Sequence, residues 1–167
     1  MLDEGDTVLA FEVPMATPEN AAGATGEYTA GHVEAFALAD VDEPVVQAFF
    51  PGAFSRTCTQ EMCQMRDWWS DLAGLDARVY GASVDPPWPL LAFVDRYDLS
   101  FPVLSGFKDD LLEEFGVRTG DGLLRGIARR SVFVVDAERT VRYTWSADEP
   151  LTFPDFEEIE DAVAAAE

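Results

Sequence analysis

Residues 49–63 read Phe49-Phe50-Pro51-Gly52-Ala53-Phe54-Ser55-Arg56-Thr57-Cys58-Thr59-Gln60-Glu61-Met62-Cys63. The stretch starts at the end of an apolar run over 45–50, breaks at a Pro-Gly pair and continues as a helix. Thr57 followed three residues later by Gln60 is a capping-box pattern, which predicts Thr57 as the N-cap and Cys58 as the first helical residue. A cysteine there lies at the positive end of the helix dipole, among backbone N–H groups without helical partners, and both features favour the thiolate.

Cys58 has two interpretations. A free cysteine is most often a small buried residue of the core. Here a capping pattern, a Pro-Gly loop and a second cysteine, Cys63, occur together within a few residues. This combination favours a reactive cysteine, because the thiolate is the nucleophile.

The motif Pro51-x-x-x-Ser55-x-x-Cys58 resembles the active-site signature of peroxiredoxins, Pro-x-x-x-(Thr/Ser)-x-x-Cys. The flanking residues are similar to the PrxQ/BCP and AhpE-like branches of this AhpC/TSA superfamily. Further segments similar to the family are Ser83-Val84-Asp85, Phe101-Pro102-Val103-Leu104-Ser105 and Gly116-Val117. The resemblance therefore extends from about residue 5 to the C-terminal helix, with one departure at Leu9, where the family usually has proline.

The composition limits the possible partners. The 167 residues are expected to form a single domain, 1–167. They include 32 acidic and 11 basic residues, a net charge of −21, and Lys108 is the only lysine. An excess of this size predicts adaptation to high salt, where self-repulsion is screened. It also argues against binding to nucleic acid or to an anionic membrane.

The N-terminus is acidic and no apolar run is long enough to span a membrane, so we expect a cytoplasmic protein. In a reducing compartment, two cysteines are more often redox-active than structural. Two cysteines and one histidine do not make a four-ligand zinc set. We therefore expect no metal site, and no other cofactor is expected where cysteine itself carries the redox change.

Alternation and apolar runs predict strands, and apolar residues at helical spacing predict helices. A short strand is expected within 5–13. Further strands are expected over 33–39, 45–50, 78–84 and 131–136, the last continuing through a hairpin to 141–145. The expected helices follow Cys58, run from Leu90 to Tyr97, cover 109–115 and begin at Pro154. Residues 15–26, rich in Ala, Gly, Pro, Thr and Asn, predict a loop. This order indicates an α/β fold with a central mixed sheet flanked by helices, and the resemblance implies a thioredoxin-like fold.

The resemblance implies a role for three residues of the motif. Cys58 is the peroxidatic cysteine, which attacks a peroxide oxygen and becomes a sulfenic acid. Ser55 keeps the hydroxyl of the commoner threonine, which can hydrogen-bond both thiolate and peroxide. Pro51 shapes the loop and shields the site from bulk water.

The resemblance also supplies a cation and a carboxylate. In the family an arginine opens the strand read as Arg-x-(Thr/Ser)-Phe-x-x-Asp, and Arg130 is the match, with Arg129 as the alternative if the alignment shifts by one. A fixed positive charge would hold the thiolate ionised and stabilise the transition state. Glu61 matches an acidic position that hydrogen-bonds this arginine in relatives, although an exposed helix carboxylate is the alternative.

Cys63 matches the resolving cysteine of PrxQ-type enzymes, in which both cysteines lie on one helix. On an intact helix, residues five apart face different directions and are farther apart than a disulfide allows. The resemblance therefore implies that the first turns unwind after Cys58 is oxidised, and that thioredoxin or a similar dithiol reduces the disulfide. In the alternative, Cys63 is structural and a small-thiol reductant recycles a one-cysteine enzyme.

The leading hypothesis is a thiol-dependent peroxidase that reduces hydrogen peroxide and alkyl hydroperoxides. The alternative from another class is a non-enzymatic thioredoxin-fold redox sensor or holdase. A pure switch needs neither the arginine nor the hydroxyl, which favours the enzyme. The loops around Trp88 and Phe107 are candidate contacts for a homodimer, although the family also contains monomers.

Overall fold

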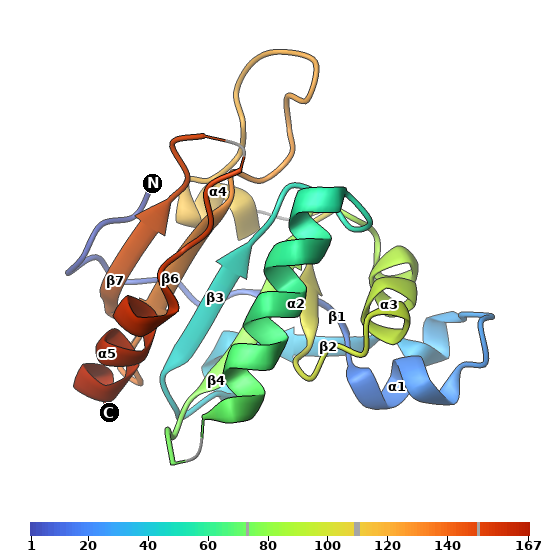
Figure 1. Cartoon of the computed structure of the whole chain (residues 1–167), viewed down its shortest axis with the longest axis horizontal. Helices are drawn as coiled ribbons and strands as arrows, with labels where there is room; N and C mark the ends of the chain where they lie inside the picture. Colours follow the sequence, from blue (N-terminus) through green and yellow to red (C-terminus); the bar gives the residue numbers. More distant parts are fainter. Residues whose placement is uncertain (73, 109–110, 150) are drawn as a thin grey trace.

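The computed structural model describes residues 1–72, 74–108, 111–149 and 151–167, and among them seven strands form one mixed sheet (Figure 1). The strand order is β2-β1-β5-β4-β3-β6-β7. β3 is parallel to β4 and β4 to β5, whereas the other neighbours are antiparallel. The strands are β1 (Glu12–Ala16), β2 (Glu34–Ala37), β3 (Val45–Phe49), β4 (Arg78–Ser83), β5 (Val103–Ser105), β6 (Ser131–Val135) and β7 (Val141–Ser146).

Helices cover both faces of the sheet, as the sequence predicted. They are α1 (Pro18–Gly23), α2 (Arg56–Asp71), α3 (Pro87–Arg96), α4 (Leu111–Phe115) and α5 (Phe156–Ala166), with short 3₁₀ turns at Ala30–His32 and Leu38–Asp40. Apolar residues of α1, α2, α3 and α5 share one core cluster, and those of α4 belong to a second cluster on the opposite face. No helix among the described residues is long and apolar enough to cross a membrane.

The central strands are apolar on both faces because each face packs against a layer. In β3, Val46 and Ala48 belong to the cluster under α2, whereas Val45 and Phe49 belong to the cluster on the α4 side. Successive side chains of a strand point to opposite faces, so a strand that is covered on both sides reads as a continuous apolar run. The strands predicted over 45–50, 78–84 and 131–136, and the hairpin to β7, are confirmed.

The N-terminal predictions need correction. The strand expected over 5–13 is wrong in its bounds, since β1 begins at Glu12 and Thr7 makes only an isolated bridge to Thr140. Leu9 is 66% exposed, so the apolar alternation that suggested an earlier strand does not correspond to a buried face. The strand expected over 33–39 is shorter and ends in a 3₁₀ turn.

The loop predicted over 15–26 is wrong in part, because it contains the end of β1 and the helix α1. Thr17 caps α1 by accepting a hydrogen bond from the backbone N–H of Asn20, and Pro18 occupies the first turn, where proline is tolerated. Ala21 and Ala24 are buried. Residues that are typical of a loop therefore also serve as the cap and the buried face of a short helix.

Three helix starts also differ from prediction. Ser55, not Thr57, is the N-cap of α2, and the helix begins at Arg56. α3 begins at Pro87 instead of Leu90, because proline fits the first helical position. α5 begins after the N-cap Asp155, so Pro154 precedes the helix instead of opening it.

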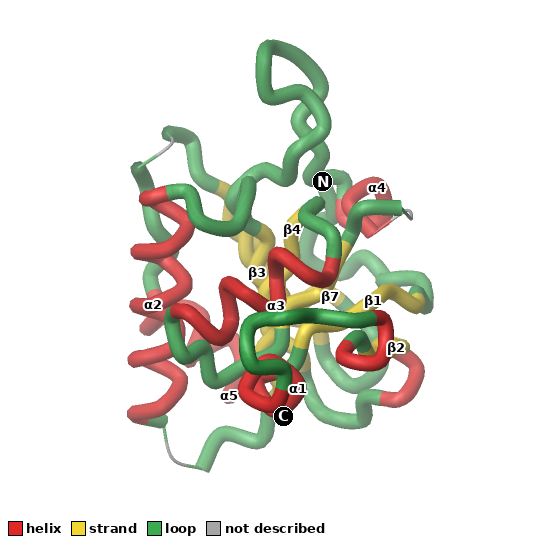
Figure 2. The backbone as a smooth tube through the Cα atoms, turned by 90° about the vertical axis from the view of Figure 1, so that its right-hand side faces the viewer, coloured by secondary structure: helices red, strands yellow, loops and turns green. Residues whose placement is uncertain are grey.

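Two regions between α3 and β6 complete the fold. The sequence did not predict the three-residue strand β5, and Asp109 and Asp110 of the expected helix 109–115 lie outside the described residues. Between α4 and β6 the chain forms a loop that stands clear of the body in both views (Figures 1 and 2). An isolated bridge between Arg118 and Ala128 closes its base, and Leu123 is fully exposed.

Candidate active site

Cys58 lies in the first turn of α2 and its side chain is fully buried. Ser55 fixes this turn, because its Oγ accepts a hydrogen bond from the backbone N–H of Cys58 at 3.3 Å and its carbonyl accepts one from Thr59 at 2.9 Å. A short loop, 50–55, leads from the central strand β3 into α2, so the positive end of the helix lies near the carboxyl end of that strand. Cys58 therefore lies in the first turn of the helix, as predicted, but it is the third helical residue instead of the first, because Ser55 and not Thr57 is the cap.

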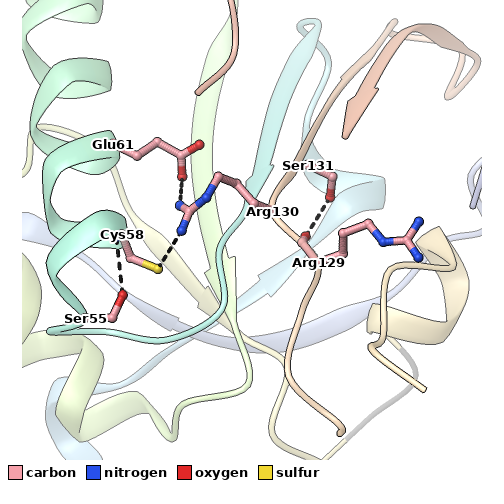
Figure 3. Close-up of polar contacts among 6 residues, drawn as sticks. All are labelled: Ser55, Cys58, Glu61, Arg129, Arg130 and Ser131. Atoms are coloured by element: carbon pink, nitrogen blue, oxygen red, sulfur yellow. Dashed lines mark hydrogen bonds and ion pairs between the residues drawn. The ribbon is translucent and has the colours of Figure 1, made fainter. Parts of the chain in front are cut away.

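Two side chains meet near Cys58: that of Arg130, which is distant in the sequence, and that of Glu61, which lies about one turn further along α2 (Figure 3). Arg130 Nη2 donates to Cys58 Sγ at 3.3 Å, and Arg130 Nη1 donates to Glu61 Oε1 at 2.8 Å. Sheet register explains the meeting, because Ser131 of β6 lies opposite Phe49 of β3. The residue before β6 is thereby placed beside the chain that leads from β3 into α2.

The ion pair between Arg130 and Glu61 is buried, with exposed side-chain fractions of 6% and 1%. Burial raises the pKa of Glu61 to about 7, although the Arg130 guanidinium opposes the shift. For Arg130, burial opposes the charge, but the Glu61 carboxylate and the Cys58 sulfur outweigh it and raise the arginine pKa above its ordinary value. Arg130 thus stays charged, while Glu61 titrates near neutral pH.

Arg129, the alternative to Arg130, is exposed, and its side chain points away from Cys58 (Figure 3). Its backbone N–H donates to the carbonyl of Val117, and its carbonyl accepts from the hydroxyl of Ser131. The side chains of Arg129 and Arg130 therefore lie on opposite sides of the chain (Figure 3). Of the two arginines, only Arg130 reaches the cysteine.

The remaining motif residues surround the same turn. Pro51 is half-buried in the loop before α2, and the Ser55 hydroxyl accepts the backbone bond described above. A hydroxyl that accepts one hydrogen bond still has its own hydrogen to donate, so capping is compatible with binding of a thiolate or peroxide.

Phe153 is a neighbour of the site that the sequence did not reveal. The Cζ atom of Arg130 lies 5.9 Å from the centre of its ring, within range of a cation–π contact. Phe153 lies in the irregular segment before α5, where no periodicity or motif distinguishes it. Only the tertiary structure places this ring over the arginine.

Residues 5–144 match the model of a protein family that is described as the "AhpC/TSA family". The chain belongs to the AhpC/TSA family. A protein of Mycobacterium tuberculosis named as a peroxiredoxin is 32% identical over 138 residues, which cover 82% of this chain and 80% of that protein. A thiol peroxidase of Aquifex aeolicus is 28% identical over 110 residues, covering 65% and 64%. Peroxiredoxins and thiol peroxidases are oxidoreductases, so the chain is an enzyme of this class.

Solved peroxiredoxin structures confirm the predicted thioredoxin-like fold. Peroxidoxin BcpB of Mycobacterium tuberculosis superposes with a TM-score of 0.74 at 28% identity, over 99% of this chain and 97% of that one. AhpC of Mycobacterium bovis superposes with a TM-score of 0.82 over 99% and 92%. At 19% identity, the second likeness concerns the fold alone.

The second cysteine of this AhpC/TSA chain, Cys63, is half-buried on the intact helix α2, and both cysteines are free. On an ideal helix, Cα atoms five residues apart are separated by about 8.7 Å. A disulfide requires Cα atoms closer than about 7 Å. In this conformation Cys58 and Cys63 therefore cannot pair without a change in the first turns of α2.

The raised pKa of Glu61 makes a prediction about stability. A carboxyl with a pKa of about 7 in the folded state and 4.5 when unfolded contributes stability below pH 4.5, and this is lost as the pH rises through 7. Glu61→Gln removes the titration and keeps an oxygen that can accept from Arg130. From pH 4.5 to 8, the free energy of urea unfolding should therefore fall more steeply in the wild type than in the variant, by on the order of 3 kcal/mol. If the free energy of unfolding falls equally with pH in both proteins, burial does not raise the pKa of Glu61.

Proposed function

We propose that this protein is a thiol-dependent peroxidase that reduces hydrogen peroxide and alkyl hydroperoxides through Cys58. The observation that carries the proposal is the 3.3 Å contact of Arg130 Nη2 with the buried Cys58 sulfur at a helix N-terminus. Such a site places a fixed cation and the positive end of a helix beside a nucleophile.

The proposed first step is a displacement at oxygen. The Cys58 thiolate attacks one peroxide oxygen, the S–O bond forms, the O–O bond breaks, and the departing oxygen takes a proton to become water or an alcohol. Sulfur is oxidised to sulfenic acid and the peroxide is reduced. Arg130 stabilises the charge that moves from sulfur to oxygen, and Glu61 orients Arg130. Ser55 donates to the reacting oxygens.

In the proposed second step, the Cys63 sulfur attacks the Cys58 sulfur, the S–O bond breaks, and the hydroxyl leaves as water. The product is an intrasubunit disulfide, which a thioredoxin-like dithiol reduces by thiol–disulfide exchange. The separation of the two cysteines on α2 requires the first turns of the helix to open for this step. Pro51, in the loop before the helix, shields the site while it is closed.

We further propose that the protein acts in the cytoplasm, where dithiol donors are kept reduced, and at high salt, which screens its net charge of −21. The proposal also includes a homodimer. Trp88 and Phe107, 44% and 48% exposed, line a mostly apolar groove of about 400 Å³ that supports contact with a second copy. Because both copies would carry the same negative charge, we expect this association to strengthen with salt.

A redox-sensing or holdase role is the second candidate, favoured by the cysteine pair on one helix. Such a switch reacts once with oxidant and does not cycle with a thiol donor. The buried Arg130–Glu61 pair supports the peroxidase instead, because a cation held against sulfur serves the transition state of peroxide attack.

The intact mass of the reduced protein after one equivalent of hydrogen peroxide tests the proposal. We expect a rapid loss of two hydrogens, since Cys58 and Cys63 pair before any reductant is added. A gain of one oxygen without pairing would support a one-cysteine peroxidase in which Cys63 is structural. No rapid change in mass would contradict the peroxidase itself.

A further inference from the structure

Asp85 connects the active-site loop to the rest of the sheet. Its Oδ2 accepts hydrogen bonds from the backbone N–H of Ala53, at 2.8 Å, and from the hydroxyl of Ser83, at 2.7 Å. Its backbone carbonyl accepts from the hydroxyl of Ser105. The loop that leads from β3 into α2 is thereby tied to the ends of β4 and β5.

Sheet topology makes this anchor rigid. β3, β4 and β5 are parallel, so their carboxyl ends meet at one edge, where Ser83 lies opposite Ser105. Both serines are buried, at 0% and 1% exposure. Because their hydroxyls bond to both the carboxylate and the carbonyl of Asp85, this residue is held in one position relative to the sheet.

The loop held by Asp85 is strained. Phe54, next to Ala53, has φ of 69°, a left-handed conformation that residues other than glycine rarely adopt. Its ring is 49% exposed and packs edge-on against Phe93, with centroids 5.3 Å apart. The Asp85 hydrogen bond and this ring contact are two attachments that hold the loop against its own strain.

The two steps of the proposed reaction demand opposite states of this loop. Peroxide attack requires Cys58 in the first turn of α2, against Arg130, where the loop and its Ser55 cap place it. Disulfide formation requires Cys58 to leave that turn, because of its separation from Cys63. An attachment that is present only in the closed loop therefore favours the first step and opposes the second.

We propose that Asp85 is a positioning residue that sets the balance between these two states of the active-site loop. It touches neither substrate nor sulfur, and acts by holding Ala53, and through it Ser55 and the first turn of α2. This inference rests on the proposed function, and in particular on Cys63 as the resolving residue. It predicts that weakening the attachment changes the two rate constants in opposite directions.

The test measures both rate constants by rapid mixing in wild type and Asp85→Ala. The variant loses the hydrogen bonds that Asp85 Oδ2 accepts from Ala53 and Ser83, and the buried Ser83 hydroxyl keeps only the bond that it accepts from the backbone N–H of residue 85. We expect the first oxidation by hydrogen peroxide to slow about twofold and the disulfide to form about threefold faster, because the product of the two changes equals the change in the ratio of open to closed loop. Under excess peroxide, the fraction that gains further oxygen on Cys58 should fall, because pairing competes with it.

Two substitutions serve as controls. Asp85→Asn keeps one side-chain oxygen that can accept from both Ala53 and Ser83. Both rate constants of this variant should therefore stay close to those of the wild type. Asp95→Ala removes an exposed carboxylate from α3 and reports the effect of lost negative charge. Should Asp85→Ala not fold, Phe54→Ala removes the other attachment at a half-exposed ring, and the same opposite shifts are expected.

A decrease of both rate constants in either loop variant would overturn the inference, since simple loss of structure slows both steps. Unchanged rate constants would overturn it as well. In that case the wild type still pairs Cys58 with Cys63, and the proposed function stands. If the wild type gains oxygen without pairing, the resolving role fails and the inference fails with it.

Discussion

Replacing Cys58 with serine abolishes peroxide consumption, with an expected loss of at least about 10³-fold, because the hydroxyl of serine is not ionised beside Arg130 and is a poor nucleophile towards a peroxide. Cys63→Ser, in contrast, leaves the rate of the first oxidation within about twofold, since Cys63 lies a helical turn away on α2. The measurement is the rate of peroxide loss in a single turnover, without reductant.

The two variants also separate the steps of recycling. Cys63→Ser should accumulate the sulfenic acid of Cys58, which a dimedone-type reagent traps, and should require a small-thiol donor for turnover. Wild type should give the disulfide and resist the trap. An equal loss of the first step in both variants would contradict the division of labour between the cysteines.

Arg130→Ala slows peroxide attack by about 10²–10³-fold, the usual cost of removing one charge-stabilising donor from a transition state. Because the adjacent cation is lost, the pH dependence of the rate should also shift to higher pH. The measurement is the second-order rate constant for hydrogen peroxide from pH 5 to 9. Arg129→Ala, which removes an exposed guanidinium that points away from Cys58, should change the rate by less than about twofold.

Arg130→Ala could slow the reaction by destabilising the fold, since Arg130 is the partner of the buried Glu61. Removing one member of a buried ion pair strongly destabilises a protein when the other stays charged. Loss of Arg130 raises the pKa of Glu61 further, so its carboxyl is neutral at pH 7. The double variant Glu61→Gln with Arg130→Ala gives the same result without any charge at position 61. An equal effect of Arg129→Ala would show that long-range charge, and not the contact with sulfur, controls the rate.

The covered sheet and the reactive helix terminus were predictable from local patterns. Continuous apolar runs over 45–50, 78–84 and 131–136 predict strands with helices on both faces, because only such strands need no polar side. The Pro-Gly break before a helical periodicity places Cys58 in a first turn. The short strand β5 and the helix α1 were missed, since three residues carry no alternation and α1 has the composition of a loop.

Sequence alone thus determined which cysteine lies in the first turn of the helix, because caps, turns and periodicity act over a few residues. It did not determine which hydroxyl caps that helix, since the capping-box pattern indicated Thr57, whereas the path of the loop makes Ser55 the cap. The tertiary structure decided the rest. Arg130 reaches Cys58 across 72 residues through the register of β6 with β3, and the pKa of Glu61 rises only because the packed layers exclude water from it.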